Sequence, residues 1–534
     1  MGRAVAIFLF ICCSAGSSGA APERWPYWRA YHKTPLEEIR PQTWRTEEDV
    51  IDGWDWSLPP TVEPDPNGLM AIRRANHLHS DLRSFLEPLD LPINTTVTLW
   101  IKWKELEPVE GVYRFDLLRK RIKEAEDMGY SVVLRILCSA TIFAPDWLEA
   151  YEIPYRKEHK QPNRKITNYE VATPAFHSRY LQLIDALGVS GIPQLEPLRG
   201  VFVGYASPSY GDEGIGPHGV NPDEVPHVME RLDAWAAAFK GVEHKVFMGG
   251  ISQYGLAKGF GVRRGFVEMF LYHIPDEVIG QQVDESGYLW VDESAAILRH
   301  SVFHGEENEE YEESWATSTS DFRFGTSTDS FVYRYFTSNL RLLQMRCNYV
   351  LYNSFSLLPE QLVWVGQSVG RTVENTPDIW CALRESYVRP VGAVKNFERW
   401  LYQRDSEGFE TEPAMRVDHA IKMWMVDGEK NYDFVARRGQ RIGLAIDDRW
   451  CGDAPVDVAI KVTYFDVGRG TFQLVTGGQV LTVELTGTEQ VKTATFFLRQ
   501  VEFSSHTVDY DLIFEGLESE PTISFVRVIR LDME

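Results

Sequence analysis

The 534-residue chain is predicted to fold into an α/β domain followed by an all-β domain. Two observations predict this fold class. Between about residues 96 and 355, apolar strand-like runs alternate with segments of helical periodicity, which is the βαβ pattern of an α/β fold. From about Asp433 onward, short runs alternate apolar and polar residues, and Gly, Asp and Thr turns separate them, which is typical of a β-sandwich.

Net charge and residue patterns limit the kinds of molecule that the protein is expected to bind. The formal net charge of -23 argues against a nucleic-acid partner, because phosphate binding needs a basic surface, although it does not exclude a locally basic cleft. No stretch after the N-terminus is apolar and long enough to insert into a membrane. We predict no cofactor: Gly259 and Gly261 do not form a dinucleotide site, because no apolar strand leads into the required spacing. The oligomeric state is left open.

The N-terminus has the three parts of a secretory signal peptide. Arg3 is followed by an apolar run from Ala4 to Cys13 and then by small residues, so we expect residues 1–20 to be removed and the protein to be secreted or periplasmic. Residues 21–66 have little periodicity and predict an irregular leader that lies over another domain. We place the α/β domain at 67–400, a linker at 401–432 and the sandwich at 433–534.

The α/β pattern begins with a strand near Thr96 that ends in the motif W-x-x-L-E-P, Trp103 to Pro108. A helix with Leu118, Ile122, Ala125 and Met128 on one face follows and is closed by Gly129, and residues 131–137 then form an almost wholly apolar strand. The order continues with a helix near 179–187, the strand at Val201, a helix near 227–239, strands near 245–248, 260–264 and 301–311, a helix near 333–345 and a strand near 349–355. The first strand of the domain cannot be placed and lies before Leu86.

The sequence W-x-x-L-E-P-x-x-G-x-Y-x-F-D, followed by a helix, a G-Y-x-V-x-L-R strand and P-x-W-L, resembles the early barrel of the clan-A glycoside hydrolases. It is similar in particular to the microbial β-galactosidase-type enzymes, and the resemblance covers residues 96–148. The resemblance implies a (β/α)8 TIM barrel and a carbohydrate substrate. It also implies a retaining mechanism with an acid/base Glu after the fourth strand and a nucleophile Glu after the seventh.

Two adjacent acids follow the strand at Val201. Val201-Phe202-Val203 suits a buried strand, and the loop after it carries Asp212 and Glu213 between two glycines. A carboxyl group at such a strand end can serve as a proton donor, but acids in a turn can also simply face water. By position, the resemblance assigns the acid/base role to Glu213, with Asp212 where the family usually has Asn. An ionised Asp cannot donate the hydrogen bond that Asn gives to a sugar.

The nucleophile is expected in the acidic cluster Glu306, Glu307, Glu309 and Glu310, where we choose Glu307 and take Glu306 as the first substitute. A cluster of this kind is also common at a solvated helix start, and Glu374 is an outside candidate. Further side chains near predicted strand ends are candidate substrate contacts, although each could equally be part of the core: Arg135, Trp147, Tyr205, Arg263 and His304.

Two other functions remain open. The absence of an Asn-Glu pair suits a barrel that binds carbohydrate without cleaving it. The H-x-H pair, His77 and His79, could hold a metal in a hydrolase, but Leu78, Leu82 and Phe85 place the pair in a predicted helix, which makes a metal site the weaker interpretation. Four of the six cysteines remain once the signal peptide, residues 1–20, is removed, and we expect them to be buried thiols, with one disulfide possible.

Overall fold

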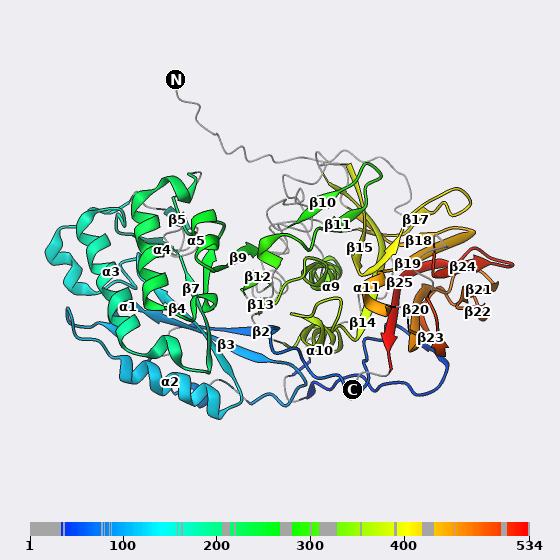
Figure 1. The fold of residues 1–534 in the computed structure, drawn as a ribbon, viewed down its shortest axis with the longest axis horizontal. Helices are drawn as coiled ribbons and strands as arrows, with labels where there is room; N and C mark the ends of the chain where they lie inside the picture. Colours follow the sequence, from blue (N-terminus) through cyan, green and yellow to red (C-terminus); the bar gives the residue numbers. More distant parts are fainter. Residues whose placement is uncertain are drawn as a thin grey trace, which may run out of the picture.

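The computed structural model describes residues 34–35, 38–75, 78–79, 81–84, 86, 88–156, 159–161, 164–204, 214–217, 220–266, 280–298, 302–308, 328–352, 355–388, 392–418, 432–452, 454–503 and 510–531. An eight-stranded closed barrel occupies one side of the molecule, and two antiparallel sheets occupy the other (Figure 1). The barrel strands are β2 (Leu69–Ala75), β3 (Thr95–Lys102), β4 (Ser131–Leu137), β7 (Leu198–Val203), β8 (Val246–Gly249), β9 (Gly261–Phe266), β12 (His304–Glu307) and β13 (Tyr349–Tyr352).

Neighbouring barrel strands are parallel and follow one another in chain order, and β13 closes the barrel against β2. This arrangement confirms the predicted (β/α)8 class. Helices of the described part surround the strands: α1 (Trp103–Leu106), α2 (Phe115–Asp127), α3 (Pro174–Val189), α4 (Pro226–Ala238), α5 (Gln253–Ala257), α9 (Thr328–Gln344) and α10 (Pro359–Ser368). Two short hairpins, β5–β6 (His159–Gln161, Arg164–Ile166) and β10–β11 (Gln281–Val283, Leu289–Val291), extend from the connections. No helix of the described residues is long and apolar enough to cross a membrane.

Alternate residues of each barrel strand face either the lumen or the helices, because side chains of a strand alternate between its two faces. One buried cluster fills the lumen: Leu69, Ala71, Val133, Phe202, Phe247, Phe303, Tyr349 and Leu351. The large rings need space, which glycines on neighbouring strands provide. A Cβ atom on Gly200 would lie 2.8 Å from the Phe303 ring, and one on Gly305 would lie 2.6 Å from the Tyr349 ring. The lumen is therefore a packed core rather than a channel.

The C-terminal unit is a two-sheet sandwich, as predicted. The larger sheet has the order β1 (Asp49–Asp52), β23 (Val491–Val501), β20 (Val456–Phe465), β25 (Thr522–Arg530), β14 (Asp378–Val388), β18 (Tyr432–Arg438) and β17 (Glu412–Asp418), with β15 (Gly392–Arg399) also paired to β14. The smaller sheet has the order β16 (Leu401–Gln403), β19 (Arg441–Ile446), β24 (Leu512–Gly516), β21 (Gly470–Thr476) and β22 (Gln479–Leu485). A separate apolar core lies in this unit, which also contains α11 (Asp448–Cys451).

The leader contacts both the barrel unit and the sandwich. Its strand β1 pairs antiparallel with β23, and Trp56 stacks on Trp364 of α10 at 4.9 Å between ring centroids. Between leader and sandwich, Asp55 forms a buried ion pair with Lys461. Helices α9 and α10 lie between the barrel and the larger sheet (Figure 1). The two units thus share a buried interface.

Several boundaries differ from the sequence interpretation. The missing first strand is β2. In place of the predicted helix around Leu82, the described residues form only a short 3-10 turn at Leu82–Ser84. The expected linker 401–432 contains β16 and β17, and β14 already pairs with β25, so the sandwich begins before residue 400. All four cysteines, Cys138, Cys347, Cys381 and Cys451, are free and buried.

Candidate active site

The fourth and seventh barrel strands carry the positions at which carboxylates are expected. Counting in chain order, β7 is the fourth strand and β12 is the seventh. Glu307 is the last residue of β12. In the parallel pair of β12 and β13, Gly305 and Glu307 stand opposite Tyr349 and Leu351, which belong to the lumen cluster. Because paired residues of parallel strands point to the same face, Glu307 faces the lumen at its carboxyl end.

Arg263 of β9 holds the Glu307 carboxylate. The two side chains form an ion pair, and only 5% of each side chain is exposed. A contact with a guanidinium stabilises the charge of a buried carboxylate, which would otherwise be costly to desolvate. Arg263 stands opposite Gly305 in the strand register, so its side chain also starts from the lumen face.

A second arginine, Arg135, also faces the lumen. Arg135 of β4 is 1% exposed and pairs in register with Trp100 and Phe202, so all three face the lumen. Its guanidinium carbon lies 4.3 Å from the centroid of the Trp100 ring and 4.8 Å from that of Phe202, and Arg263 lies 4.2 Å from the same Phe202 ring. Arg135, Arg263 and Glu307 are therefore brought together around Phe202 at the carboxyl end of the barrel. Trp100 and Phe202 were not expected from the sequence, because they lie opposite Arg135 only through the register of neighbouring strands.

The neighbouring acid and histidine of β12 face the other way. Glu306 stands opposite Val350 and His304 opposite Val262, and both partners belong to the core between strands and helices. The His304 ring is 1% exposed, and its Nε2 lies 3.0 Å from the Met345 carbonyl oxygen just after α9. His304 is therefore placed in the helix layer, away from the lumen where a substrate contact was expected. Glu306, the substitute nucleophile, is 0% exposed in the same layer.

Trp147 packs against the W-x-x-L-E-P motif, outside the lumen. Its indole donates to the Glu107 carbonyl oxygen at 3.0 Å and meets Trp103 edge-on at 5.8 Å. The Glu107 carboxylate in turn accepts from the Trp103 indole and from the Gly111 amide, both at 2.7 Å. Burial raises the pKa of Glu107, against the opposing effect of these hydrogen bonds. Within the described residues, this motif stabilises the loop after β3.

The remaining predicted site residues, Tyr205, Asp212 and Glu213, lie outside the described residues, as does His77. They follow Val203, the last residue of β7, in sequence. Glu374 is exposed and comes after α10 rather than after a barrel strand. Among the described residues, no group of three His, Cys, Asp or Glu side chains is placed to hold a metal ion.

A family model described as β-galactosidase matches residues 79–187, much less than half of the chain. A comparison with curated proteins finds no match. Similar solved structures include endo-glycoceramidase II from Rhodococcus sp., with 12% identity, 82% of this chain and 99% of that chain covered, and a TM-score of 0.30. Two others are the exo-β-1,4-mannosidase Op5Man5 from Opitutaceae bacterium strain TAV5 (13% identity, 39% of each chain, TM-score 0.25) and a β-galactosidase from Halorubrum lacusprofundi (14% identity, 38% and 41%, TM-score 0.26).

The chain thus spans well under two thirds of the mannosidase and the haloarchaeal enzyme. The matched family and these three structures all carry names of glycosidases. The family match covers β3, α2, β4 and most of α3, the part of the barrel that holds the W-x-x-L-E-P motif, and stops before β12. Over residues 79–187, the chain is therefore similar to the β-galactosidase family, as its motifs predicted.

Proposed function

We propose that the protein is a secreted glycoside hydrolase that cleaves O-glycosidic bonds of an oligo- or polysaccharide with retention of configuration. The observation that carries the proposal is the position of Glu307: it ends the seventh strand, faces the lumen and is held by Arg263. The active site of a (β/α)8 barrel lies at the carboxyl ends of its strands, and hydrolysis of a glycoside needs carboxyl groups there. The family match over residues 79–187 supports the same reaction class.

In this mechanism Glu307 attacks the anomeric carbon while Glu213 protonates the leaving oxygen. A glycosyl-enzyme ester forms on Glu307 as the bond to the leaving group breaks. Glu213, now a carboxylate, then takes a proton from water, which displaces Glu307. Arg263 stabilises the negative charge of Glu307 before attack and after its release, and its own guanidinium lies over the Phe202 ring. For retention, the two carboxyl groups must lie roughly 5 Å apart.

The proposed secretion rests on the N-terminal pattern alone, with Arg3 before the apolar run of Ala4 to Cys13. Mass spectrometry of the protein recovered outside the cytosol should find a mature N-terminus near Ala21. Recovery from the cytosol with residues 1–20 still attached would contradict export.

The enzymatic proposal is tested by reducing-sugar release from a panel of polysaccharides and by cleavage of activated aryl glycosides. In Glu213→Gln, hydrolysis of substrates with poor leaving groups should fall by about 10²–10⁴-fold, the usual worth of general acid catalysis. Hydrolysis of activated aryl glycosides should fall less, because their leaving groups need less protonation.

Binding of a polysaccharide without release of sugar by the wild type would instead favour a non-catalytic carbohydrate-binding protein. Loss of activity on EDTA treatment, restored by added metal, would favour a metal-dependent hydrolase.

A further inference from the structure

A pocket opens at the amino-terminal end of the barrel, opposite the candidate active site. It has a volume of about 350 Å³ and is lined by Asn67, Leu69, Arg199, His244, Lys245, Val302, Phe303 and Asn348. These residues stand at the starts of strands: Leu69 begins β2, Lys245 precedes β8, and Phe303 precedes β12. Phe303 and Glu307 are four residues apart on one strand, so about 13 Å separates this pocket from the candidate active site.

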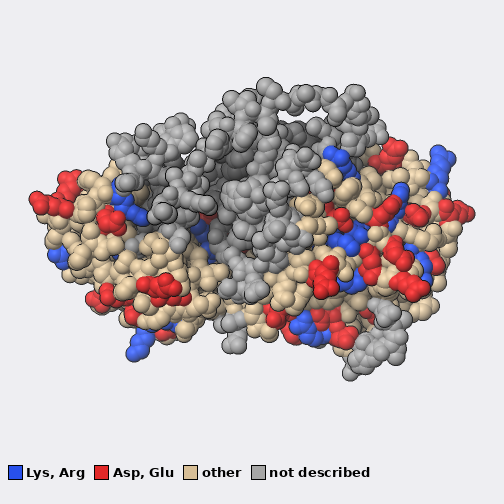
Figure 2. Space-filling view, turned by 90° about the horizontal axis from the view of Figure 1, so that it is seen from above, with Lys and Arg blue, Asp and Glu red and all other residues tan. Residues whose placement is uncertain are grey.

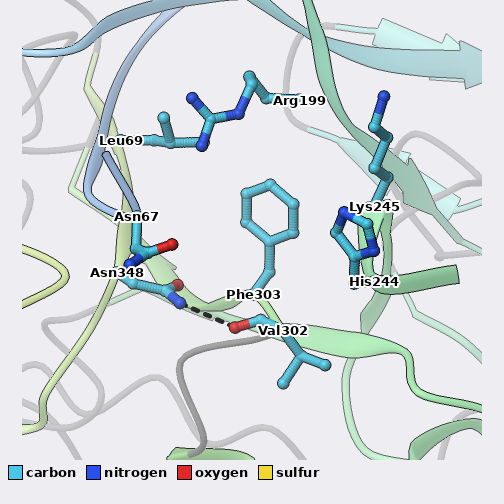
Figure 3. A pocket seen from close by; sticks show the side chains of 8 residues that line it. All are labelled: Asn67, Leu69, Arg199, His244, Lys245, Val302, Phe303 and Asn348. Atoms are coloured by element: carbon cyan, nitrogen blue, oxygen red, sulfur yellow. Dashed lines mark hydrogen bonds between the residues drawn. The ribbon is translucent and has the colours of Figure 1, made fainter. Parts of the chain in front are cut away.

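The polar lining of this amino-end pocket is basic. Arg199, His244 and Lys245 come from two neighbouring strand starts, and no Asp or Glu among the described residues lines the pocket. Figure 3 shows the Phe303 ring in the middle of the pocket, with Arg199 across from it and His244 and Lys245 together on one side. On a chain with a net charge of -23, whose acidic side chains are spread over both units (Figure 2), such a concave group of bases is unusual.

Among the described residues, the hydrogen bonds of Arg199 and Lys245 leave some of their donors available for a ligand. The described residues satisfy one Arg199 nitrogen, which donates to the Pro66 carbonyl oxygen at 2.6 Å. Lys245 donates to the carbonyl oxygens of Pro193 and Leu195 at 3.1 and 2.9 Å, which holds its ammonium group in place and leaves one N–H. Within the described part of the chain, no Asp or Glu forms an ion pair with any of the three bases, although Glu196 and Glu243 lie close enough to act on Lys245 and His244.

Desolvation is the main cause that lowers the pKa of Arg199, of His244 and of Lys245. Mutual repulsion adds to it, because Arg199 also lowers the pKa of Lys245 and of His244. A negatively charged group between them would relieve this repulsion. Phe303, Leu69 and Val302 provide an apolar surface beside the bases, and the volume lies in the range of small-molecule pockets, roughly 300–1,000 Å³.

We propose that the amino-end pocket binds a small molecule with an oxyanion group, a carboxylate, phosphate or sulfate, on a body of about one sugar ring. The oxyanion lies between Arg199, His244 and Lys245, and the body rests on Phe303 and Leu69. This site is separate from the candidate active site and does not depend on the proposed hydrolysis.

The test uses the full chain and isothermal titration with glucose 6-phosphate, glucose 6-sulfate and glucuronate, with glucose as the neutral control. Inorganic phosphate and sulfate show whether the anion alone suffices. We expect saturable binding of at least one anionic sugar and none of glucose. Arg199→Gln should raise Kd by about tenfold or more, since hydrogen bonds to charged groups are the stronger kind.

His244→Glu provides the decisive variant. His244 is exposed, so the exchange leaves the packing intact and places a negative charge at the rim. It should abolish binding, whereas Arg469→Glu, at an exposed turn of the sandwich, should not change Kd. Thermal unfolding of each variant confirms that it is folded. If no anionic probe binds saturably, or if His244→Glu and Arg469→Glu bind alike, the proposal is wrong; the second outcome would place the probe elsewhere, including the active site.

Discussion

The two ends of the barrel hold their charged side chains in opposite ways. At the carboxyl end, Glu307 and Arg263 are almost fully buried and contact each other. At the amino end, Arg199 and Lys245 are partly exposed, and no carboxylate among the described residues pairs with them. A buried charge must be compensated within the protein, whereas a partly solvated one can await a ligand. This difference suits the covalent chemistry proposed for the carboxyl end and the reversible binding of an anion proposed for the amino end.

The largest effect is expected at the carboxyl end, from removing the lumen-facing acid. Glu307→Gln should lower kcat by about 10⁴–10⁶-fold, as losing the nucleophile does in other covalent enzymes. Glu306→Gln is the matched control, because its side chain faces the helix layer. It should keep kcat near that of the wild type in the folded fraction, whatever it does to stability. Steady-state kinetics on an aryl glycoside decides the assignment, and the reverse pattern would move the nucleophile to Glu306.

The ion pair between Arg263 and Glu307 can also be broken by replacing the arginine. Arg263→Met leaves the Glu307 carboxylate buried without its guanidinium and should reduce the free energy of unfolding by about 3–5 kcal/mol. The double variant Arg263→Met/Glu307→Gln should recover part of this loss, because no uncompensated carboxylate remains. Urea unfolding of the four proteins gives the coupling free energy. If the losses in free energy of unfolding are additive, the coupling free energy of the pair is zero. The contrast drawn between the two ends of the barrel would then be wrong.

The order of the barrel strands could be read from the sequence because fully buried parallel strands are continuous apolar runs, such as the one at 131–137. The first strand escaped because its apolar part, Leu69 to Ile72, is only four residues long and is followed by Arg73 and Arg74. Strand β16 escaped because its three residues are too few to show alternation. The local sequence pattern therefore predicted the strands that are buried along their whole length. It missed short strands whose pairing partners lie far away in the sequence.

In the candidate site, the choice of Glu307 over Glu306 agrees with the face on which each lies. The error at His304 had a signal: it is three residues from Glu307, an odd number, so the two cannot share a face of a regular strand. The amino-end pocket had no such signal, because its lining comes from five strand starts spread from residue 67 to residue 348. Only the closed barrel brings these residues together.

A smaller effect, at the amino end, is a pH dependence of anion binding. Partial burial, then Lys245 and Arg199, hold the pKa of His244 below its ordinary value of 6.5, and Glu243 opposes them. A bound anion raises this pKa, so the complex holds more protons than the free pocket in the window between the two values. Affinity for glucose 6-sulfate, whose charge is constant there, should rise as pH falls through that window, by at most about tenfold per pH unit for one proton. Titrations at several pH values test this, and a dependence that persists in His244→Gln would assign it to another group.

The smallest effect is expected at Trp147, which lies at the carboxyl end but outside the lumen. Trp147→Phe keeps an aromatic ring beside Trp103 and removes the donor to the Glu107 carbonyl oxygen. The free energy of unfolding should fall by about 1 kcal/mol, the usual net worth of one hydrogen bond, while KM stays unchanged. Trp100→Phe is the matched control, because that ring faces the lumen and contacts Arg135; it should lower kcat/KM instead. A raised KM in Trp147→Phe at unchanged stability would return Trp147 to the substrate-binding role expected from the sequence and would extend the site beyond the lumen, onto the loop after β4.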